Sequence, residues 1–275
     1  MGNNARTYGQ DLMRGEHTVG GGMNRQTSAD KYHTSASASA MSMAGGFSEE
    51  QQSGTSIFDP VLCELAYRWF SPARGKVLDP FAGGSVRGIV ASVLGRAYTG
   101  VELRAEQVAA NRAQADIATG PAPVWVCGDS RDIPEIAPGP YDMVFSCPPY
   151  AHLEVYSDDP RDLSTMGYPD FLAAYRRIIA AACAQLAPDS FAVFVVGEVR
   201  DKRGNYLNFV GDTVKAFLDA GLSFYNEAIL ITAVGSLPIR VGKQFAASRK
   251  LGKTHQNILV FVKGDGKRAA QRCAA

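Results

Sequence analysis

Between residues 76 and 196 the chain alternates short apolar runs with longer stretches that repeat apolar residues at helical spacing. The apolar runs cover residues 76–79, 97–102, 124–127, 141–145 and 191–196, and the helical patterns cover residues 86–94, 105–116 and 171–186. Strands separated by helices are joined by crossovers, which make them parallel neighbours in one sheet with helices on both faces. The alternation therefore predicts an α/β fold built on a doubly wound, mostly parallel sheet.

The segments on either side extend this prediction. Asp59 followed by Pro60 is typical of a helix start, and the apolar spacing continues this helix to about residue 70. A further helix is expected over residues 209–220. Two late apolar runs, residues 228–232 and 257–262, are expected to add an antiparallel hairpin at the edge of the sheet.

The two ends of the chain differ from this central part. Residues 1–55 are rich in Gly, Ser, Ala, Asn and Gln and have few apolar side chains, so folding could not offset their ordering entropy. We expect a flexible, low-complexity N-terminal arm, a single domain over residues 56–265, and a flexible tail over residues 266–275.

Composition narrows the class of protein. The formal net charge is +1, so affinity for nucleic acid would have to come from a local basic patch. Five cysteines without a C-x-x-C pair argue against a disulfide framework or a zinc cluster, and we expect no metal. No apolar stretch reaches the roughly 18 residues needed to cross a bilayer, and no signal peptide is recognisable. These features indicate a cytoplasmic protein without membrane association.

The turn after the first predicted strand has the features of a cofactor site. Gly83 and Gly84 leave room for a ligand to approach the backbone, and Asp79 precedes them. Glu102 ends the next strand about twenty residues later, the spacing at which a carboxylate meets ribose hydroxyls. Asp129 ends the third strand and is placed to accept a hydrogen bond from an adenine amine.

Neither the dinucleotide G-x-G-x-x-G pattern nor the P-loop pattern is present, so the turn favours a positively charged nucleoside, S-adenosylmethionine, over a phosphate. The alternative is a plain strand-to-helix turn, which three acids at three successive strand ends make less attractive. The candidate cofactor residues are Asp79, Pro80, Phe81, Gly83, Gly84, Ser85, Glu102 and Asp129.

A second turn, Ser146-Cys147-Pro148-Pro149-Tyr150, follows the fourth predicted strand. The two prolines fix the backbone and remove two donors, which holds the turn's carbonyl groups rigidly as acceptors. Tyr150 could stack on a base drawn out of a nucleic acid. A rigid turn with a core tyrosine is the simpler interpretation of the same residues.

The two turns together resemble the amino-group DNA methyltransferases, which methylate adenine N6 or cytosine N4. The resemblance covers roughly residues 55–265: the DPFAGGS block is similar to the family's cofactor motif, and the CPPY block to its catalytic motif. The helix just upstream of the first turn looks like the family's additional cofactor-packing motif. The motif order and the short spacing are similar to those of compact methylases often found on phages.

This resemblance implies a Rossmann-like fold, S-adenosylmethionine as cofactor, and DNA as partner, in a bacterial or phage-infected host cell. It implies that the first residue of the catalytic motif and a main-chain carbonyl bind the target amine, while the aromatic residue stacks on the flipped base. Carried onto this chain, the catalytic residues are Cys147, Pro148, Pro149 and Tyr150.

Cys147 departs from the family pattern, which has Asp, Asn or Ser at that position. A thiol is a weak hydrogen-bond acceptor. Three interpretations are open. Cys147 is a tolerated substitution, and carbonyl groups and Ser146 orient the amine; or the protein is a weakened enzyme or a binding protein that does not methylate. In the third, Cys147 is a nucleophile for pyrimidine C5 methylation, and His152 is the cation that lowers its pKa.

A basic loop is expected over residues 235–255, between the two late strands. Residues 228–264 contain no acid, and the loop carries the candidate nucleic-acid contacts Arg240, Lys243, Arg249, Lys250 and Lys253. A solvated charged loop without a partner is the alternative. The segment 154–170 follows the catalytic turn and is expected to form either a wall over the base or an exposed loop.

The sequence thus predicts an S-adenosylmethionine-dependent, site-specific methyltransferase acting on an exocyclic amine of DNA, adenine N6 or cytosine N4. The alternatives are a nucleic-acid-binding protein that has lost the chemistry, an RNA base methyltransferase, and a pyrimidine-C5 methyltransferase that uses Cys147. Since the recognition loop is small, a specificity partner or a homodimer is a further expectation.

Overall fold

The computed structural model describes residues 58–150, 153, 155–232 and 237–274, without the side chain of Arg240. The expected N-terminal arm, residues 1–55, lies outside these residues. So does His152, the cation proposed for a nucleophilic Cys147.

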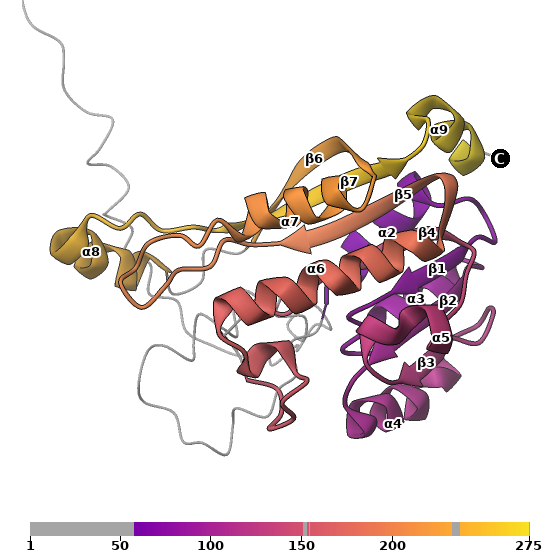
Figure 1. Cartoon of the computed structure of the whole chain (residues 1–275), viewed down its shortest axis with the longest axis horizontal. Helices are drawn as coiled ribbons and strands as arrows, with labels where there is room; N and C mark the ends of the chain where they lie inside the picture. The colour runs from indigo at the N-terminus through magenta and orange to yellow at the C-terminus, as the bar shows by residue number, and fades with distance from the viewer. Residues whose placement is uncertain (1–57, 151–152, 154, 233–236, 275) are drawn as a thin grey trace, which may run out of the picture. The chain divides into compact units, whose positions relative to one another are not determined.

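Within the described residues, seven strands form one sheet in the order β3-β2-β1-β4-β5-β7-β6 (Figure 1). Their bounds are β1 Lys76–Asp79, β2 Ala97–Glu102, β3 Val124–Cys127, β4 Tyr141–Ser146, β5 Leu186–Val196, β6 Ser223–Ile231 and β7 His255–Lys263. The strands from β3 to β5 are parallel, whereas β7 pairs antiparallel with both β5 and β6. The predicted doubly wound sheet with an antiparallel edge pair is confirmed.

Helices cover both faces of this sheet. Their bounds are α2 Pro60–Phe70, α3 Val86–Val93, α4 Ala105–Ala113, α5 Ile133–Ile136, α6 Tyr168–Gln185, α7 Phe209–Asp219, α8 Leu237–Ser248 and α9 Gly266–Ala274. Residues of α5, α6 and α7 share one apolar core with the sheet, and residues of α2, α3, α4 and α9 share the other. Two cores on opposite faces are expected of a sheet that is buried on both sides.

Strand β5 shows why its sequence is almost continuously apolar. Phe191, Val193 and Val195 belong to the core under α2, whereas Ala192 and Phe194 belong to the core under α6. Because successive side chains point to opposite faces, a strand covered on both faces has no polar positions to alternate with.

Helix α2 begins where its sequence predicts. The side chain of Asp59 accepts hydrogen bonds from the backbone N–H groups of Val61 (2.8 Å) and Leu62 (3.3 Å). Pro60 occupies the first helical turn, where its missing N–H costs nothing. The helix packs Leu62, Cys63 and Tyr67 into the core beside β5.

The prediction of a basic loop over residues 235–255 is wrong for most of its length, because Leu237–Ser248 form α8. Leu237, Val241 and Phe245 recur every fourth residue, and the surrounding residues include strong helix formers. The helix ends at Arg249, which has a φ of 56° and whose guanidinium lies 5.1 Å from the centre of the Phe245 ring.

The prediction of a flexible tail over residues 266–275 is also wrong, because Gly266–Ala274 form α9. Asp265 begins this helix by accepting a hydrogen bond from the N–H of Arg268 (2.8 Å). Ala269 is 1% exposed, and Arg272 donates to the carbonyl groups of Pro188 (2.8 Å) and Asp189 (2.9 Å). These tertiary contacts hold a segment whose own sequence carries little apolar surface.

Strand β6 is longer than predicted because it pairs along its length with β7, from Ser223 opposite Val262 to Ile231 opposite His255.

None of the described helices is long and apolar enough to cross a membrane. Among the same residues, no group of three or more His, Cys, Asp or Glu side chains is arranged to hold a metal ion.

The contacts of Arg272 generate a stability prediction. Replacing Arg272 by Ala removes charge-assisted hydrogen bonds to two carbonyl groups, to Ser190 and to Asp142 (2.5 Å). We expect a loss of about 1–2 kcal/mol in the free energy of unfolding, measured by urea denaturation. Lys267→Ala, on the exposed side of the same helix, is the control and should change stability by less than about 0.5 kcal/mol. Equal effects of the two substitutions would contradict the docking of α9.

Candidate active site

The two turns singled out in the sequence lie side by side. The Asp79–Ser85 turn follows β1 and the Ser146–Tyr150 turn follows β4, and these two strands are parallel neighbours in the sheet. From β1 the chain proceeds outward to β2 and β3, then returns to the other side of β1 as β4. This reversal is the switch point of a doubly wound sheet, where ligands bind at the carboxyl ends of the strands.

Asp79 connects the two turns. Its carboxylate is fully buried and accepts hydrogen bonds from Arg87 Nε (2.6 Å), Tyr98 Oη (2.8 Å), Ser146 Oγ (2.5 Å) and the N–H of Phe81 (3.1 Å). A carboxylate with this many inward donors has little capacity left for a ligand. Its role is therefore to fix the backbone of the cofactor turn and to join it to β4.

Arg87 is the counter-charge of Asp79. It is 5% exposed, and its terminal nitrogen also donates to the carbonyl groups of Phe81 (2.6 Å) and Ala82 (2.9 Å). Burial acts to lower the pKa of Arg87, but the charge and hydrogen bond of Asp79, together with Tyr98 and Cys147, outweigh burial and raise it. The guanidinium remains charged, pairs with a charged partner and holds the turn that leads into α3.

The glycine turn is clamped from two sides and open on a third. Glu102 Oε2 accepts the N–H of Gly83 (3.0 Å), and Asn111 Nδ2 donates to the carbonyl of Gly83 (2.7 Å). Gly83 has a φ of 51°, which favours glycine. A Cβ placed on Gly83 or Gly84 would meet no atom of the described residues within 4 Å. The backbone therefore faces open space at the position where a ligand would approach.

Glu102 lies beside the same turn. Its other oxygen accepts the N–H of Arg104 (3.0 Å), and the Arg104 guanidinium lies 3.7 Å away. Burial raises the pKa of Glu102 despite these contacts. One carboxylate thus holds the glycine turn and retains further lone pairs for a donor such as a hydroxyl group.

Asp129 is occupied by a neighbour. Arg131 donates to both carboxylate oxygens through its guanidinium, and its N–H donates to Oδ1 (2.9 Å). Burial acts to raise the pKa of Asp129, but these hydrogen bonds and the charge of Arg131 outweigh it, so the pKa lies below its usual value. An adenine amine would reach Asp129 through a remaining lone pair or by displacing Arg131.

The other predicted cofactor residues shape the turn. The carbonyl of Pro80 accepts from Ser130 Oγ (2.6 Å), and Phe81 packs against the rings of Tyr175 and Phe194. Ser85 precedes α3 and donates its hydroxyl to Gln114 Oε1 without capping the helix.

In the second turn, the side chain of Ser146 points inward. It is fully buried, donates to Asp79 and accepts the N–H of Phe81 (3.2 Å). The expectation that Ser146 helps to orient a target amine stays a prediction, for which the buried hydroxyl has one lone pair left beyond its bonds to Asp79 and Phe81. Its role is to fix the distance between the two turns.

Cys147, Pro148, Pro149 and Tyr150 follow at the strand end. Cys147 Sγ lies 3.7 Å from the Tyr150 hydroxyl oxygen, which accepts a hydrogen bond from Gln256 Nε2 (2.6 Å). Tyr150 packs edge-on against Phe209, with ring centres 6.2 Å apart. Burial, followed by the charge of Cys147, raises the pKa of Tyr150 well above its usual value. The phenol is neutral at physiological pH and anchored to β7.

The segment after this turn lies beside the residues around Glu102, one of the predicted cofactor residues. Arg104 donates to the carbonyl of Tyr156 (3.4 Å), and the N–H of Tyr156 donates to Ser164 Oγ (3.1 Å). Asp162 accepts from Ser157 Oγ (2.8 Å). The predicted wall over the base remains a hypothesis, but its described part is tied to the residue that contacts Glu102.

The candidate nucleic-acid contacts are distributed over two kinds of structure. Arg240 and Lys243 lie in α8, and Arg249, Lys250 and Lys253 follow it before β7. Burial lowers the pKa of Lys253, which faces both Glu198 and Arg200. Within the described part of the chain, Lys243, Arg249, Lys250 and Lys253 form no hydrogen bond or ion pair with the two turns.

Several residues of the site were not predicted from the sequence. Arg87, Tyr98 and Asn111 hold the cofactor turn, and Gln256 holds Tyr150. Arg87 offered one signal, a charge within an otherwise apolar helical pattern. The others lie 19 to 106 residues away from their partners, a distance at which sequence spacing carries no information.

No protein-family model and no curated protein matches the chain. Among solved structures, TrmN from Thermus thermophilus is similar, with a TM-score of 0.51 and 16% identity over 78% of this chain and 51% of that one. The chain thus spans about half the length of TrmN.

Two further similar structures have lower TM-scores. One is magnesium protoporphyrin IX methyltransferase from Synechocystis PCC 6803 with bound SAM, with a TM-score of 0.46 and 14% identity over 74% of this chain and 76% of that one. The other is a second Thermus thermophilus protein, described as a DNA modification methylase, with a TM-score of 0.37 and 20% identity over 50% of this chain and 52% of that one. At these identities the likeness concerns the fold. The chain has the Rossmann-like α/β fold of methyltransferases.

The buried carboxylate generates a prediction about folding. Asp79→Asn leaves Arg87 buried without its counter-charge, which we expect to cost about 3–5 kcal/mol of unfolding free energy. Asp159→Asn is the control, because Asp159 also pairs with an arginine but near the solvent, where such pairs contribute little to stability. Urea denaturation of both variants measures the difference. A loss below about 1 kcal/mol for Asp79→Asn would contradict its central position.

Proposed function

We propose that the chain is an S-adenosylmethionine-dependent methyltransferase that methylates an exocyclic amine of DNA, adenine N6 or cytosine N4. One observation carries the proposal: the hydrogen bond between Ser146 and Asp79 holds a Pro-Pro-Tyr turn next to an open glycine turn at the switch point of the sheet. A ligand on the glycine turn and a planar base beside Tyr150 would then be neighbours.

The residues at the glycine turn fit S-adenosylmethionine. The open space over Gly83 and Gly84 admits a ligand against the backbone, Glu102 offers lone pairs to ribose hydroxyls, and Asp129 offers an acceptor to the adenine amine. Carboxylate oxygens accept hydrogen bonds from hydroxyl and amine groups, which a nucleoside offers and an ionised phosphate does not. When bound there, S-adenosylmethionine supplies an electrophilic methyl group.

The second turn is suited to holding a planar base with an amine. Two prolines limit the motion of the backbone, and Tyr150 presents a ring fixed by Phe209 and Gln256. With Ser146 turned inward, the acceptors for the amine are the main-chain carbonyl groups of the Cys147–Pro148 turn, and the thiol is a weak addition. Alignment of amine and methyl group would supply most of the rate enhancement.

DNA is the proposed partner, contacted through Arg240, Lys243, Arg249, Lys250 and Lys253 on and after α8. A near-neutral protein needs such a local group of cations to bind a polyanion. The five cysteines, all in the described part of the chain, are thiols rather than disulfides, in keeping with the reducing cytoplasm proposed for this enzyme.

The open space over the glycine turn generates a prediction about cofactor binding. Gly84→Val puts a branched side chain into that space without meeting protein atoms, so the fold should keep its thermal stability while the affinity for S-adenosylhomocysteine falls at least about 100-fold. Calorimetric titration measures the affinity. Gly167→Val, also at an unobstructed glycine, is the control and should bind normally. Unchanged binding by Gly84→Val would exclude this turn as the cofactor site.

Incubation with methyl-labelled S-adenosylmethionine and unmethylated DNA or RNA, followed by digestion to nucleosides, tests the substrate. The proposal predicts label in N6-methyladenine or N4-methylcytosine from DNA. Label only in RNA, or in 5-methylcytosine, would overturn the substrate assignment. Cofactor binding without label in any nucleoside would favour a binding protein.

The same assay tests Cys147. Cys147→Asn restores a strong acceptor, and turnover should rise by about tenfold if one hydrogen bond of about 1.4 kcal/mol is gained in the transition state. Cys147→Ala is the matched control, for which we expect activity close to that of the unaltered chain. Loss of all activity in both variants would indicate a nucleophilic cysteine and contradict the amine mechanism.

A further inference from the structure

The outward face of α2 carries an apolar stripe that no described residue covers. Val61 is 63% exposed, Leu65 37% and Trp69 59%, and these three residues recur at every fourth position. The opposite face of the helix is buried in the core. Trp69 is notable because a tryptophan left in water forgoes a large hydrophobic stabilisation, and because tryptophans concentrate at interaction surfaces.

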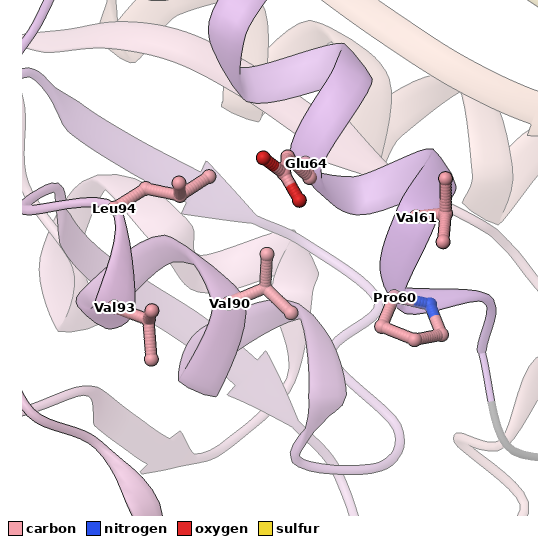
Figure 2. A pocket seen from close by; sticks show the side chains of 6 residues that line it. All are labelled: Pro60, Val61, Glu64, Val90, Val93 and Leu94. Carbon is pink, nitrogen blue, oxygen red and sulfur yellow. The ribbon is translucent and has the colours of Figure 1, made fainter.

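A groove adjoins the start of this stripe. Residues of α2 and α3 line it, and all but Glu64 are apolar: Pro60, Val61, Glu64, Val90, Val93 and Leu94. Figure 2 shows Val90 and Val93 of α3 on one side and Pro60 and Val61 of α2 on the other. Val93 is 54% exposed, so the groove opens to the solvent.

We propose that this face binds the same face of a second copy of the chain, with Trp69 of each copy in the α2–α3 groove of the other. The groove lies at the first turn of α2 and Trp69 at its last turn, eight residues or about 12 Å apart. A twofold axis passing near Leu65 would exchange these two ends. The protruding Trp69 side chain and the groove lie at equal distances from this axis. The surface is therefore self-complementary, as an isologous dimer requires.

The charges on α2 have the same symmetry. Glu64 and Arg68 form an ion pair of 2.7 Å on the exposed face. When two α2 helices run antiparallel about a centre at Leu65, Glu64 of one copy lies two residues, or about 3 Å along the helix axis, from Arg68 of the other, within reach of these long side chains. Antiparallel pairing therefore places opposite charges together beside the apolar stripe, whereas parallel pairing would bring like charges together.

The size of the surface sets the strength of the association. Eleven residues of α2 span about 16 Å, and with the edge of α3 they form a small contact surface, typical of weak or transient complexes. We therefore expect a dimer that dissociates in the micromolar range. The interface shares no residue with the two turns of the proposed active site, so the inference stands independently of the proposed function.

Sedimentation of the full chain over about 1–200 μM tests the dimer. Quenching of tryptophan fluorescence by acrylamide measures the exposure of Trp69 on this face. The chain has two tryptophans, and the second, Trp125, is only 1% exposed. We expect Trp69 to become protected from quenching as the dimer forms. Trp69→Ala should abolish the concentration-dependent sedimentation, and Leu65→Ala, which keeps the tryptophan, should weaken both changes, whereas Ile117→Ala, at an exposed apolar residue outside this face, should alter neither.

The charge pair gives a test that distinguishes contacts between copies from contacts within one. Glu64→Arg alone and Arg68→Glu alone place like charges opposite one another and should each weaken the homodimer at least about tenfold. Mixing the two single variants restores both pairs and should recover association, as should the double variant. Recovery in neither case would overturn the proposal.

Two further outcomes would contradict the inference. A chain that stays monomeric at about 200 μM with Trp69 fully open to quenching would show that the face has no partner copy. A monomer whose Trp69 is protected at every concentration, and becomes open when residues 1–55 are removed, would show that the N-terminal segment covers the face instead.

Discussion

The fully buried carboxylate of Asp79 is the interaction on which the rest of the site depends. Burying a charge is costly unless it has a counter-charge and its lone pairs are satisfied, and both conditions hold here. Arg87 supplies the charge, and Tyr98, Ser146 and the N–H of Phe81 supply the remaining donors. Because these donors come from α3, β2, β4 and the turn itself, one side chain sets the mutual positions of the elements around the switch point.

This arrangement separates the residues that build the site from those left to contact ligands. Asp79 and Ser146 face inward, although Asp79 belongs to a block that resembles a family motif and Ser146 directly precedes the other. Gly83 and Gly84 border open space among the described residues, Glu102 accepts the N–H of Gly83, and Cys147 and Tyr150 follow the end of the neighbouring strand. Motif membership alone does not separate these two groups; the direction of the side chains and their hydrogen bonds do.

The sequence predicted the parallel strands and both turns because their signals are local: apolar runs of strand length, paired glycines, and paired prolines. It missed α8 and α9, since an apparently polar, basic segment can be helical when a few apolar side chains or an arginine find tertiary partners. Arg87, Asn111 and Gln256 escaped prediction for a related reason. Their functions come from partners that only the folded chain brings near.

A crystal structure of the chain with S-adenosylhomocysteine would test the central claim most directly. The account predicts the nucleoside over Gly83 and Gly84, with its ribose hydroxyls on Glu102 and its adenine amine near Asp129, and an unchanged hydrogen bond between Ser146 and Asp79. A ligand bound elsewhere, or no binding at millimolar concentration, would contradict it.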